Sequence, residues 1–172
     1  LYEYSIADNK TKILLSRECR QPAGLRLDTL TKKIFFINRS EGLDNVDEGS
    51  IVRSEINGKE LNHLIINDAA WIRDPINFEI YSPDNKIYWL DKKLKSIFYA
   101  DLDGKNQKKI YNTAFFWPNA IKIDKTNLNI YWSDYYKGIN RCNLLGIDVV
   151  LIYKPATSEH IKSIEVIGNH LY

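Results

Sequence analysis

Two carboxylates occupy matching places in the sequence and are the first residues that could carry out chemistry. Asp91 ends the segment Ile-Tyr-Trp-Leu-Asp, and Asp134 ends the segment Ile-Tyr-Trp-Ser-Asp 43 residues later. Carboxylates are among the groups that general acid and base catalysis uses. Because each of these two closes a copy of one recurring aromatic motif, we interpret them as acids in a structural motif and expect no catalytic residue.

Other nucleophilic and metal-binding residue types are few. Cys19 and Cys142 have no metal-ligand spacing and no neighbouring histidine, so a disulfide with each other or with sequence outside the chain stays open. One acidic stretch lacks the spaced oxygen ligands and the glycine of an EF-hand loop, which favours a solvated loop. Its members are Glu41, Asp44, Asp47 and Glu48. We therefore predict no metal site and no cofactor.

The composition is that of a folded protein with little net charge. Hydrophobic residues make up 44% and charged residues 27% of the 172 residues, which favours a globular domain over a disordered tail. Lysine and arginine total 24 against 22 acidic residues, which gives no basic footprint for nucleic acid. No apolar run approaches the roughly 20 residues of a membrane helix. Because methionine is absent, we expect a segment of a longer protein, with any signal or anchor in the missing part.

The two acids follow an internal repeat. The pairs Tyr88-Trp89 and Tyr131-Trp132 lie 43 residues apart, Phe35-Phe36 is a weaker copy 53 residues earlier, and Leu171-Tyr172 begins a fourth copy. An alternating apolar segment, typical of a half-buried strand, precedes each pair. Its apolar positions are Leu25 and Leu27, Phe78 and Ile80, Ile121 and Ile123, and Ile164 and Val166.

A glycine turn follows each aromatic strand, at Asn57-Gly58, Asp103-Gly104 and Leu145-Gly146. Asn-Gly and Asp-Gly between strand-like runs are strong hairpin signals, because both residues tolerate positive φ. Each unit therefore reads strand, hairpin, aromatic strand, loop, strand, glycine turn, strand, which is a four-stranded antiparallel blade. The ten extra residues of the first unit fall in loops and leave its strands in phase.

Repeated blades of this length predict an all-β fold, a β-propeller. At Tyr88-Trp89-Leu90-Asp91 and Tyr131-Trp132-Ser133-Asp134 the sequence resembles the YWTD (class B) repeats of the low-density-lipoprotein receptor family. The copy Phe35-Phe36-Ile37-Asn38 is weaker, since it lacks both Trp and Asp. The resemblance implies a partial segment of a six-bladed ring, with three complete four-stranded blades and two half blades. The expected parts are 1–21, the end of a blade; 22–74, 75–117 and 118–160, three blades; and 161–172, the start of the closing blade.

The resemblance also implies structural roles for the repeated residues. The aromatic residues Tyr88, Trp89, Tyr131 and Trp132 recur on one strand and should fill the space between sheets. By analogy with the family, Asp91 and Asp134 form hydrogen bonds between blades.

Two glycosylation sequons begin at Asn9 and Asn38. Asn9 lies at a predicted hairpin tip and is the expected acceptor. Asn38 takes the place of the family's structural aspartate, so we expect it to be partly buried and unmodified.

Ligand binding is expected on the face where the loops between blades and the loops between second and third strands emerge, because loops vary while strands are fixed. The candidate ligand-binding residues on this face are Arg73, Phe116, Trp117, Tyr135, Tyr136 and His160. Trp, Tyr and Arg dominate binding hot spots. Phe116 and Trp117 are either exposed anchors or aromatics tucked into the joint between blades, and His160 is a candidate switch for ligand release in acidic endosomes.

The predicted function is a non-enzymatic, extracellular ligand-binding and scaffolding module of an endocytic or signalling receptor. Its expected partners are a protein ligand on the loop face and neighbouring EGF-like or other extracellular modules of the same chain. Nucleic acid is not expected to bind, and a membrane is reached only through missing segments. The expected location is the extracellular side of the plasma membrane or the endosomal lumen.

Two alternatives stay open: a metal-dependent hydrolase of lactonase or esterase type, and the extracellular part of a sevenless-type receptor kinase. A hydrolase needs carboxylate, Asn or His side chains that converge on the central channel. The residues that lead into the first strands contain no acid; they are Ala23, Gly24, Ile76, Asn77, Asn119 and Ala120.

Overall fold

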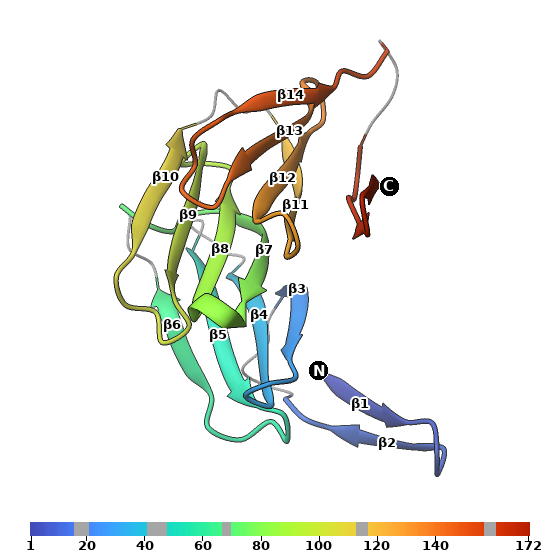
Figure 1. Cartoon of the computed structure of the whole chain (residues 1–172). Coiled ribbons are helices and arrows are strands. Elements are labelled where there is room, and N and C mark those ends of the chain that lie inside the picture. The colour runs from blue at the N-terminus through green and yellow to red at the C-terminus, as the bar shows by residue number, and fades with distance from the viewer. Residues whose placement is uncertain (16–20, 41–47, 67–69, 113–116, 157–160) are drawn as a thin grey trace.

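The computed structural model describes residues 1–15, 21–40, 48–66, 70–112, 117–156 and 161–172. Within these residues the secondary structure is β-strand apart from one 3-10 turn, η1 (Ser82–Asp84). The strands form three consecutive four-stranded antiparallel sheets and two separate hairpins (Figure 1). The all-β blade architecture predicted from the repeat is confirmed.

The three sheets are named blades 1, 2 and 3. Blade 1 contains β3 (Gln21–Asp28), β4 (Lys33–Ser40), β5 (Glu48–Glu55) and β6 (Asn62–Ile66). Blade 2 contains β7 (Pro75–Tyr81), β8 (Lys86–Asp91), β9 (Ser96–Asp101) and β10 (Lys108–Asn112). Blade 3 contains β11 (Pro118–Asp124), β12 (Asn129–Asp134), β13 (Gly138–Asn143) and β14 (Val150–Tyr153). The hairpins are β1 (Tyr2–Ser5) with β2 (Lys10–Ile13), and β15 (Val166–Ile167) with β16 (His170–Leu171).

The blades stack so that their first strands lie next to one another. Strand β7 contacts both β3 and β11, and the last strands β6 and β10 lie on the far side of the sheets (Figure 1). This places β3, β7 and β11 along the inner side of the arc and the fourth strands on its rim. A β-propeller has this arrangement around its central channel.

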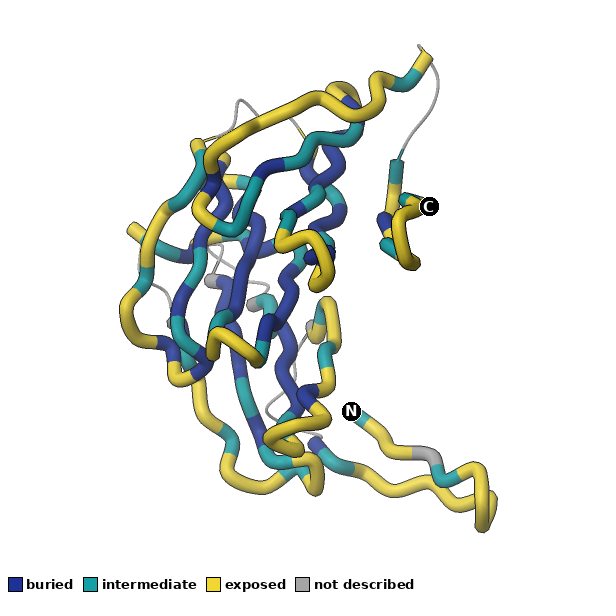
Figure 2. Tube along the Cα trace, in the orientation of Figure 1, coloured by how far each residue is buried: buried dark blue, intermediate teal, exposed yellow. Residues whose placement is uncertain are grey.

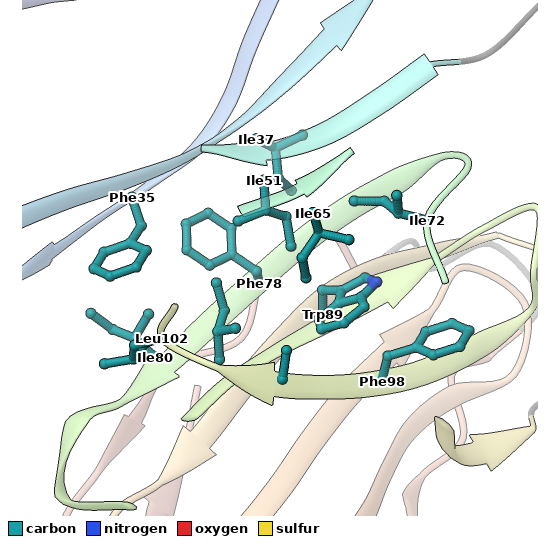
Figure 3. Close-up of a cluster of buried hydrophobic side chains, with 12 residues drawn as sticks. Phe35, Ile37, Ile51, Ile65, Ile72, Phe78, Ile80, Trp89, Phe98 and Leu102 are labelled. Carbon is teal, nitrogen blue, oxygen red and sulfur yellow. The ribbon is translucent and has the colours of Figure 1, made fainter. Parts of the chain in front are cut away.

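The core consists of the interfaces between blades and a smaller cluster in which Leu15 packs on Phe36 and Val52 of blade 1, and its buried residues follow the middle strands (Figure 2). Between blades 1 and 2, Phe35 and Ile51 face Phe78 and Trp89, as Figure 3 shows. The ring of Trp89 stacks on Phe98 with 5.4 Å between ring centroids. Its indole Nε1–H donates to a backbone carbonyl at 3.2 Å, so the buried polar atom is satisfied.

The aromatic pair of each blade is divided between two interfaces. Trp89 packs toward blade 1, whereas Tyr88 belongs to the cluster between blades 2 and 3 together with Trp132. Successive side chains on a strand point to opposite faces, so adjacent residues reach opposite neighbours. One dipeptide therefore contributes to the packing on both sides of its blade.

Two predicted core residues are exposed instead. Leu25 and Leu27 of β3 are 51% and 50% exposed, although the matching Phe78 and Ile80 of β7 are buried. The residues of β7 are covered by blade 1, while Leu25 and Leu27 of β3 face the β1–β2 hairpin across an open apolar groove. The expectation of a half-buried pattern was therefore wrong for β3, because burial here depends on the neighbouring sheet.

Cys142 is buried with a free thiol in the interface between blades 2 and 3. Burial raises the pKa of this thiol to about 12, against a small opposing effect of Arg141. The open alternative of a disulfide between Cys142 and Cys19 is not realised, and Cys19 lies outside the described residues. Cys142 packs as a small apolar side chain.

The glycine turns after the third strands lie in close contact with the outer strand of the preceding blade. Gly104 has φ +85°, and a Cβ at this position would lie 2.2 Å from the carbonyl oxygen of Leu64 in blade 1. Gly146 has φ +80° and would meet Ile110 of blade 2 at the same distance. The glycine thus satisfies two constraints, a left-handed backbone and a close contact with the preceding outer strand.

Replacing Gly104 with alanine should lower the free energy of unfolding by about 2 kcal/mol or more, because it adds backbone strain and a clash between blades. Urea denaturation measures this loss. Gly168 is a matched control, since it has φ +57° but nothing within 4 Å of the added Cβ. Gly168→Ala should show only the backbone strain, about 1 kcal/mol, and equal losses in the two variants would contradict the role of the contact.

Asp28 joins two blades through its carboxylate. Its oxygens accept from the hydroxyls of Thr31 at 2.6 Å and Ser82 at 3.0 Å, and from the backbone N–H of Leu30 at 3.1 Å. Burial acts to raise the pKa of Asp28, but these donors outweigh it and hold the pKa below the ordinary 3.8. The ionised form is therefore the one that the fold stabilises.

Because the folded-state pKa is lower than the unfolded one, the contribution of Asp28 is present near neutral pH and lost as the pH falls through the folded-state pKa. Asp28→Asn should cost about 1–2 kcal/mol near neutral pH, and its difference from the wild type should shrink below pH 3.8. Denaturant unfolding over a pH series measures both quantities. Asp8→Asn, at an exposed turn, is the control; a pH-independent cost at Asp28 would show that its charge has no part.

Candidate ligand-binding face

The loops on one end of the blades are held by the repeated aspartates. Asp91 is fully buried and accepts from the backbone N–H groups of Arg73 at 2.7 Å, Asp74 at 2.9 Å and Leu94 at 2.8 Å. Burial raises the pKa of Asp91, while the three N–H donors act in the opposite direction. The side chain thereby joins the loop that enters blade 2 to the turn between β8 and β9.

Asp134 repeats the arrangement one blade later. It accepts from the N–H groups of Trp117 at 3.1 Å, Tyr136 at 2.9 Å and Lys137 at 3.0 Å. All these donors belong to the backbone, so the two aspartates fix loop geometry and are sequestered from any ligand. Their hydrogen bonds run between an interblade loop and the blade that follows it.

Backbone hydrogen bonds also join these loops and turns. The N–H of Lys92 donates to the carbonyl of Asp74 at 2.9 Å, and the N–H of Tyr135 donates to the carbonyl of Trp117, also at 2.9 Å. Each interblade loop is therefore tied twice to the turn between second and third strands. The side chains that these loops carry are presented by a fixed backbone.

Trp117 is the main apolar side chain on this face. It is 50% exposed, and the ammonium of Lys92 lies 3.9 Å from its ring centroid. The contact joins the β8–β9 turn to the loop before β11. A cation over an aromatic face orients the ring and keeps a positive charge beside it. Lys92 lies in one of the loops between second and third strands, but the sequence carries no signal for its pairing with Trp117.

Two tyrosines extend the aromatic surface over blade 3. The rings of Tyr135 and Tyr136 meet edge to face with 4.7 Å between centroids, and Tyr136 is 60% exposed. Because Tyr135 bonds to the backbone of Trp117, the three aromatics follow one another across the joint between blades 2 and 3. The structure thus brings together three of the six predicted ligand-binding residues.

Basic residues border the aromatics. Arg73 is exposed beside the Asp91 brace, and Lys93 and Lys137 are exposed on the two turns. The acid of the interblade loop, Asp74, is paired with Arg39 of blade 1 at 2.9 Å. The exposed charged residues named on this face, Arg73, Lys93 and Lys137, are therefore positive, whereas the acid Asp74 is compensated by Arg39.

The other predicted positions lie away from these aromatics or outside the described residues. Phe116 and His160 lie outside the described residues, as does the acidic stretch 41–47. Asn9 is exposed at the turn between β1 and β2, and Asn38 is half-buried within β4. Tyr131 is half-buried on the face of blade 3 that points away from blade 2.

The inner strands carry a ladder of alternating charges that the sequence reading did not identify. Its members, at spacings of 53, 43 and 43 residues, are Arg26, Glu79, Lys122 and Glu165. Arg26 contacts Glu79 at 2.7 Å, and Lys122 reaches Glu79 at 3.8 Å and Glu165 at 3.0 Å. The contact with Lys122 lowers the pKa of Glu165. The signal was available in the sequence, since the spacings equal those of the alternating apolar segments.

The charge ladder leaves the carboxylate of Glu79 compensated on the side of the blades that faces the channel. Glu79 is 4% exposed and lies between two cations, so its charge is compensated within the protein. Asn77 accepts from the N–H of Phe78 at 2.8 Å and from Arg26 at 3.2 Å. In the described part of the chain, no three His, Cys, Asp or Glu side chains gather as a metal-binding group.

The described residues contain no helix long and apolar enough to cross a membrane.

Comparison with known proteins agrees with this geometry. Residues 85–124 match the family model for low-density lipoprotein receptor repeat class B. The vitellogenin receptor of Solenopsis invicta is 28% identical over 161 residues, which is 87% of this chain and 8% of the receptor. The chain therefore spans a small part of that relative.

Solved structures show the same fold. A chain in a crystal structure of a nidogen/laminin complex superposes with a TM-score of 0.75 at 21% identity, covering 90% of this chain and 56% of that one. A gluconolactonase from Xanthomonas campestris gives a TM-score of 0.67 at 14% identity, covering 94% and 56%. The predicted resemblance is confirmed: residues 85–124 match a low-density lipoprotein receptor class B repeat, and the chain has the fold of β-propeller blades.

Proposed function

We propose that this chain is the ligand-binding part of an extracellular receptor and has no catalytic activity of its own. The observation that carries the proposal is the braced loop face, where Trp117 stands half exposed between Lys92 and the tyrosines. Rigid, partly exposed aromatics beside cations have the character of binding hot spots. The receptor relative and the class B repeat support the same class of function.

The chemistry of the face favours a protein ligand with an acidic and apolar segment. The cations Arg73, Lys93 and Lys137 are exposed around the aromatics. The buried carboxylates Asp91 and Asp134 accept backbone N–H groups, so they oppose an acidic ligand little. An apolar side chain of the ligand would pack on Trp117 while its carboxylates met the surrounding cations.

The setting that we propose follows from the same relatives. The chain would lie in the ectodomain of a receptor at the plasma membrane or in the endosomal lumen, next to EGF-like or other extracellular modules of the same protein. Asn9, exposed at a hairpin tip, would carry a glycan. His160 keeps its proposed role in ligand release at acidic pH.

A hydrolase is the second candidate, because a gluconolactonase has the same fold. Metal-dependent hydrolysis needs oxygen or nitrogen ligands free to hold a cation in the channel. The channel carboxylate Glu79 is instead compensated by Arg26 and Lys122. This charge pairing favours the receptor function over hydrolysis.

The binding face can be tested with a displayed random peptide library selected on the intact chain. Selected peptides should be enriched in acidic and apolar residues, and Trp117→Ala should weaken their binding by about tenfold or more, as for an aromatic hot spot. Affinity is measured by surface plasmon resonance. Lys109→Ala, on the exposed rim of blade 2, is the control and should bind as the wild type does. Equal binding by the Trp117 variant would place the ligand elsewhere.

The enzymatic alternative is tested directly. The chain is incubated with Ca²⁺ or Mn²⁺ and with lactone and aryl ester substrates, and hydrolysis is followed by absorbance. We expect no turnover above that of the metal in buffer, because the channel acid is neutralised. Turnover that a chelator abolishes and that Glu79→Gln reduces would establish hydrolysis and overturn the proposed function.

A further inference from the structure

The rim of blade 3 is apolar where the rims of the other blades are polar. Strand β14 has the sequence Val-Leu-Ile-Tyr, and every residue in it is exposed. Figure 2 shows the exposed trace along β14. Monomeric proteins protect such strands with charged residues, proline or a cover, so an apolar edge strand calls for an explanation.

The blades can be compared position by position because their third turns share one hydrogen-bond pattern. In blade 2 the N–H of Asp101 donates to the carbonyl of Lys105 at 2.9 Å, and the N–H of Gly104 donates to that of Asp101 at 2.8 Å. In blade 3 the corresponding bonds are Asn143 to Ile147 and Gly146 to Asn143, both at 3.0 Å. These bonds fix an offset of 42 residues along the third turn and fourth strand.

With this offset, five polar positions of blade 2 become apolar in blade 3. The blade 2 residues are Asp103, Lys105, Gln107, Lys108 and Lys109, and their blade 3 counterparts are Leu145, Ile147, Val149, Val150 and Leu151. All five apolar side chains are at least 38% exposed. Blade 1 is polar at the matching positions Asn62 and His63. Blade 3 therefore has an exposed apolar surface along its rim, which blades 1 and 2 do not have.

A neighbouring blade would not cover the two central residues of this segment. Lys108 and Lys109 are exposed although blade 3 packs beside blade 2. The matching Val150 and Leu151 therefore lie on the outer rim whatever packs beside blade 3. Strand β14 is also the last strand of its sheet, so one of its edges faces outward.

The sequence around β14 is complementary to itself in antiparallel orientation. If Leu151 is placed opposite Leu151 of a second copy, Val150 lies opposite Ile152 and Asp148 lies opposite Lys154. Both charged residues are exposed. The apolar centre meets an apolar centre in favourable cross-strand pairs. Asp148 lies in the turn before β14, where it accepts a hydrogen bond from Asn143, and Lys154 directly follows the strand, so an acid and a base meet just beyond each end of the paired strands.

We propose that two copies of this chain associate through antiparallel pairing of their β14 strands, centred on Leu151. The two blade 3 sheets become one continuous sheet across a twofold axis, and the apolar rim residues of each copy cover those of the other. The pairing joins only short strands, so the association is weak and reversible. It involves neither the loop face nor the channel side of the blades.

The oligomeric state of the full chain in solution tests this proposal. Sedimentation velocity over a concentration series should show a reversible dimer of twice the 20.1 kDa chain mass. The double variant Val150→Lys, Leu151→Lys takes the residues of blade 2, so the strand keeps a sequence that its fold accepts. It should be monomeric at every concentration, with an unchanged melting temperature. The matched variant Asn62→Lys, His63→Lys on blade 1 should dimerise as the wild type does.

A charge exchange tests the register. Lys154→Asp places an acid opposite Asp148 at both ends and should weaken dimerisation about tenfold. Adding Asp148→Lys restores opposite charges and should recover the wild-type constant to within about threefold. Recovery supports the centred antiparallel register.

Three results would overturn the proposal. They are a wild-type chain that stays monomeric at all concentrations, a dimer that persists in the Val150→Lys, Leu151→Lys variant, and a charge exchange that fails to restore dimerisation while the melting temperature is unchanged. Polydisperse association instead of a defined dimer would also contradict it.

Discussion

A four-stranded sheet has two faces, and in this chain a face is buried where a neighbouring segment lies against it, which is another blade for most of the core and the amino-terminal segment for Phe36 and Val52 of blade 1. Trp89 and Tyr88 are neighbours in sequence, yet one belongs to the interface with blade 1 and the other to the interface with blade 3. The core is thus a series of interfaces, two made by consecutive blades and a smaller one made by blade 1 and the amino-terminal segment. Every other feature depends on this packing, because it fixes how the loops and inner strands of neighbouring blades meet.

Two kinds of contact hold the same interfaces at opposite ends. Backbones approach closely at the rim, and buried carboxylates accept hydrogen bonds at the loop face. Gly104 lies against the carbonyl of Leu64, so the outer strand of one blade meets the third turn of the next. At the other end, Asp91 gathers N–H groups from the incoming loop. On the inner side, Arg26 and Glu79 link the first strands by charge. Packing, hydrogen bonds and charge therefore specify one relative placement of the blades.

This arrangement separates structural chemistry from surface chemistry. The acids that first suggested catalysis, Asp91 and Asp134, are buried and accept backbone hydrogen bonds. The surface carries Trp117 with a lysine over its ring, and the rim of blade 3 carries an apolar strand. A repeat scaffold allows such differences, because loop and rim positions can change while the interface positions keep the blades in place.

The repeat in the sequence was sufficient to predict the strands, their order and the division into blades, because strand period and turn glycines are local signals. The spacing of 43 residues also contained the charge ladder, but the sequence does not show that Glu79 lies between Arg26 and Lys122. The sequence could not predict that Leu25 and Leu27 are exposed while Phe78 and Ile80 are buried. All four have the same local pattern, and only the presence of a neighbouring sheet distinguishes them. The pairing of Lys92 with Trp117 likewise joins two loops whose distance is set by blade packing. The sequence by itself determined the strands and turns of each blade. The tertiary structure decided which faces, loops and edges of the blades meet, because those contacts join residues that no local signal relates.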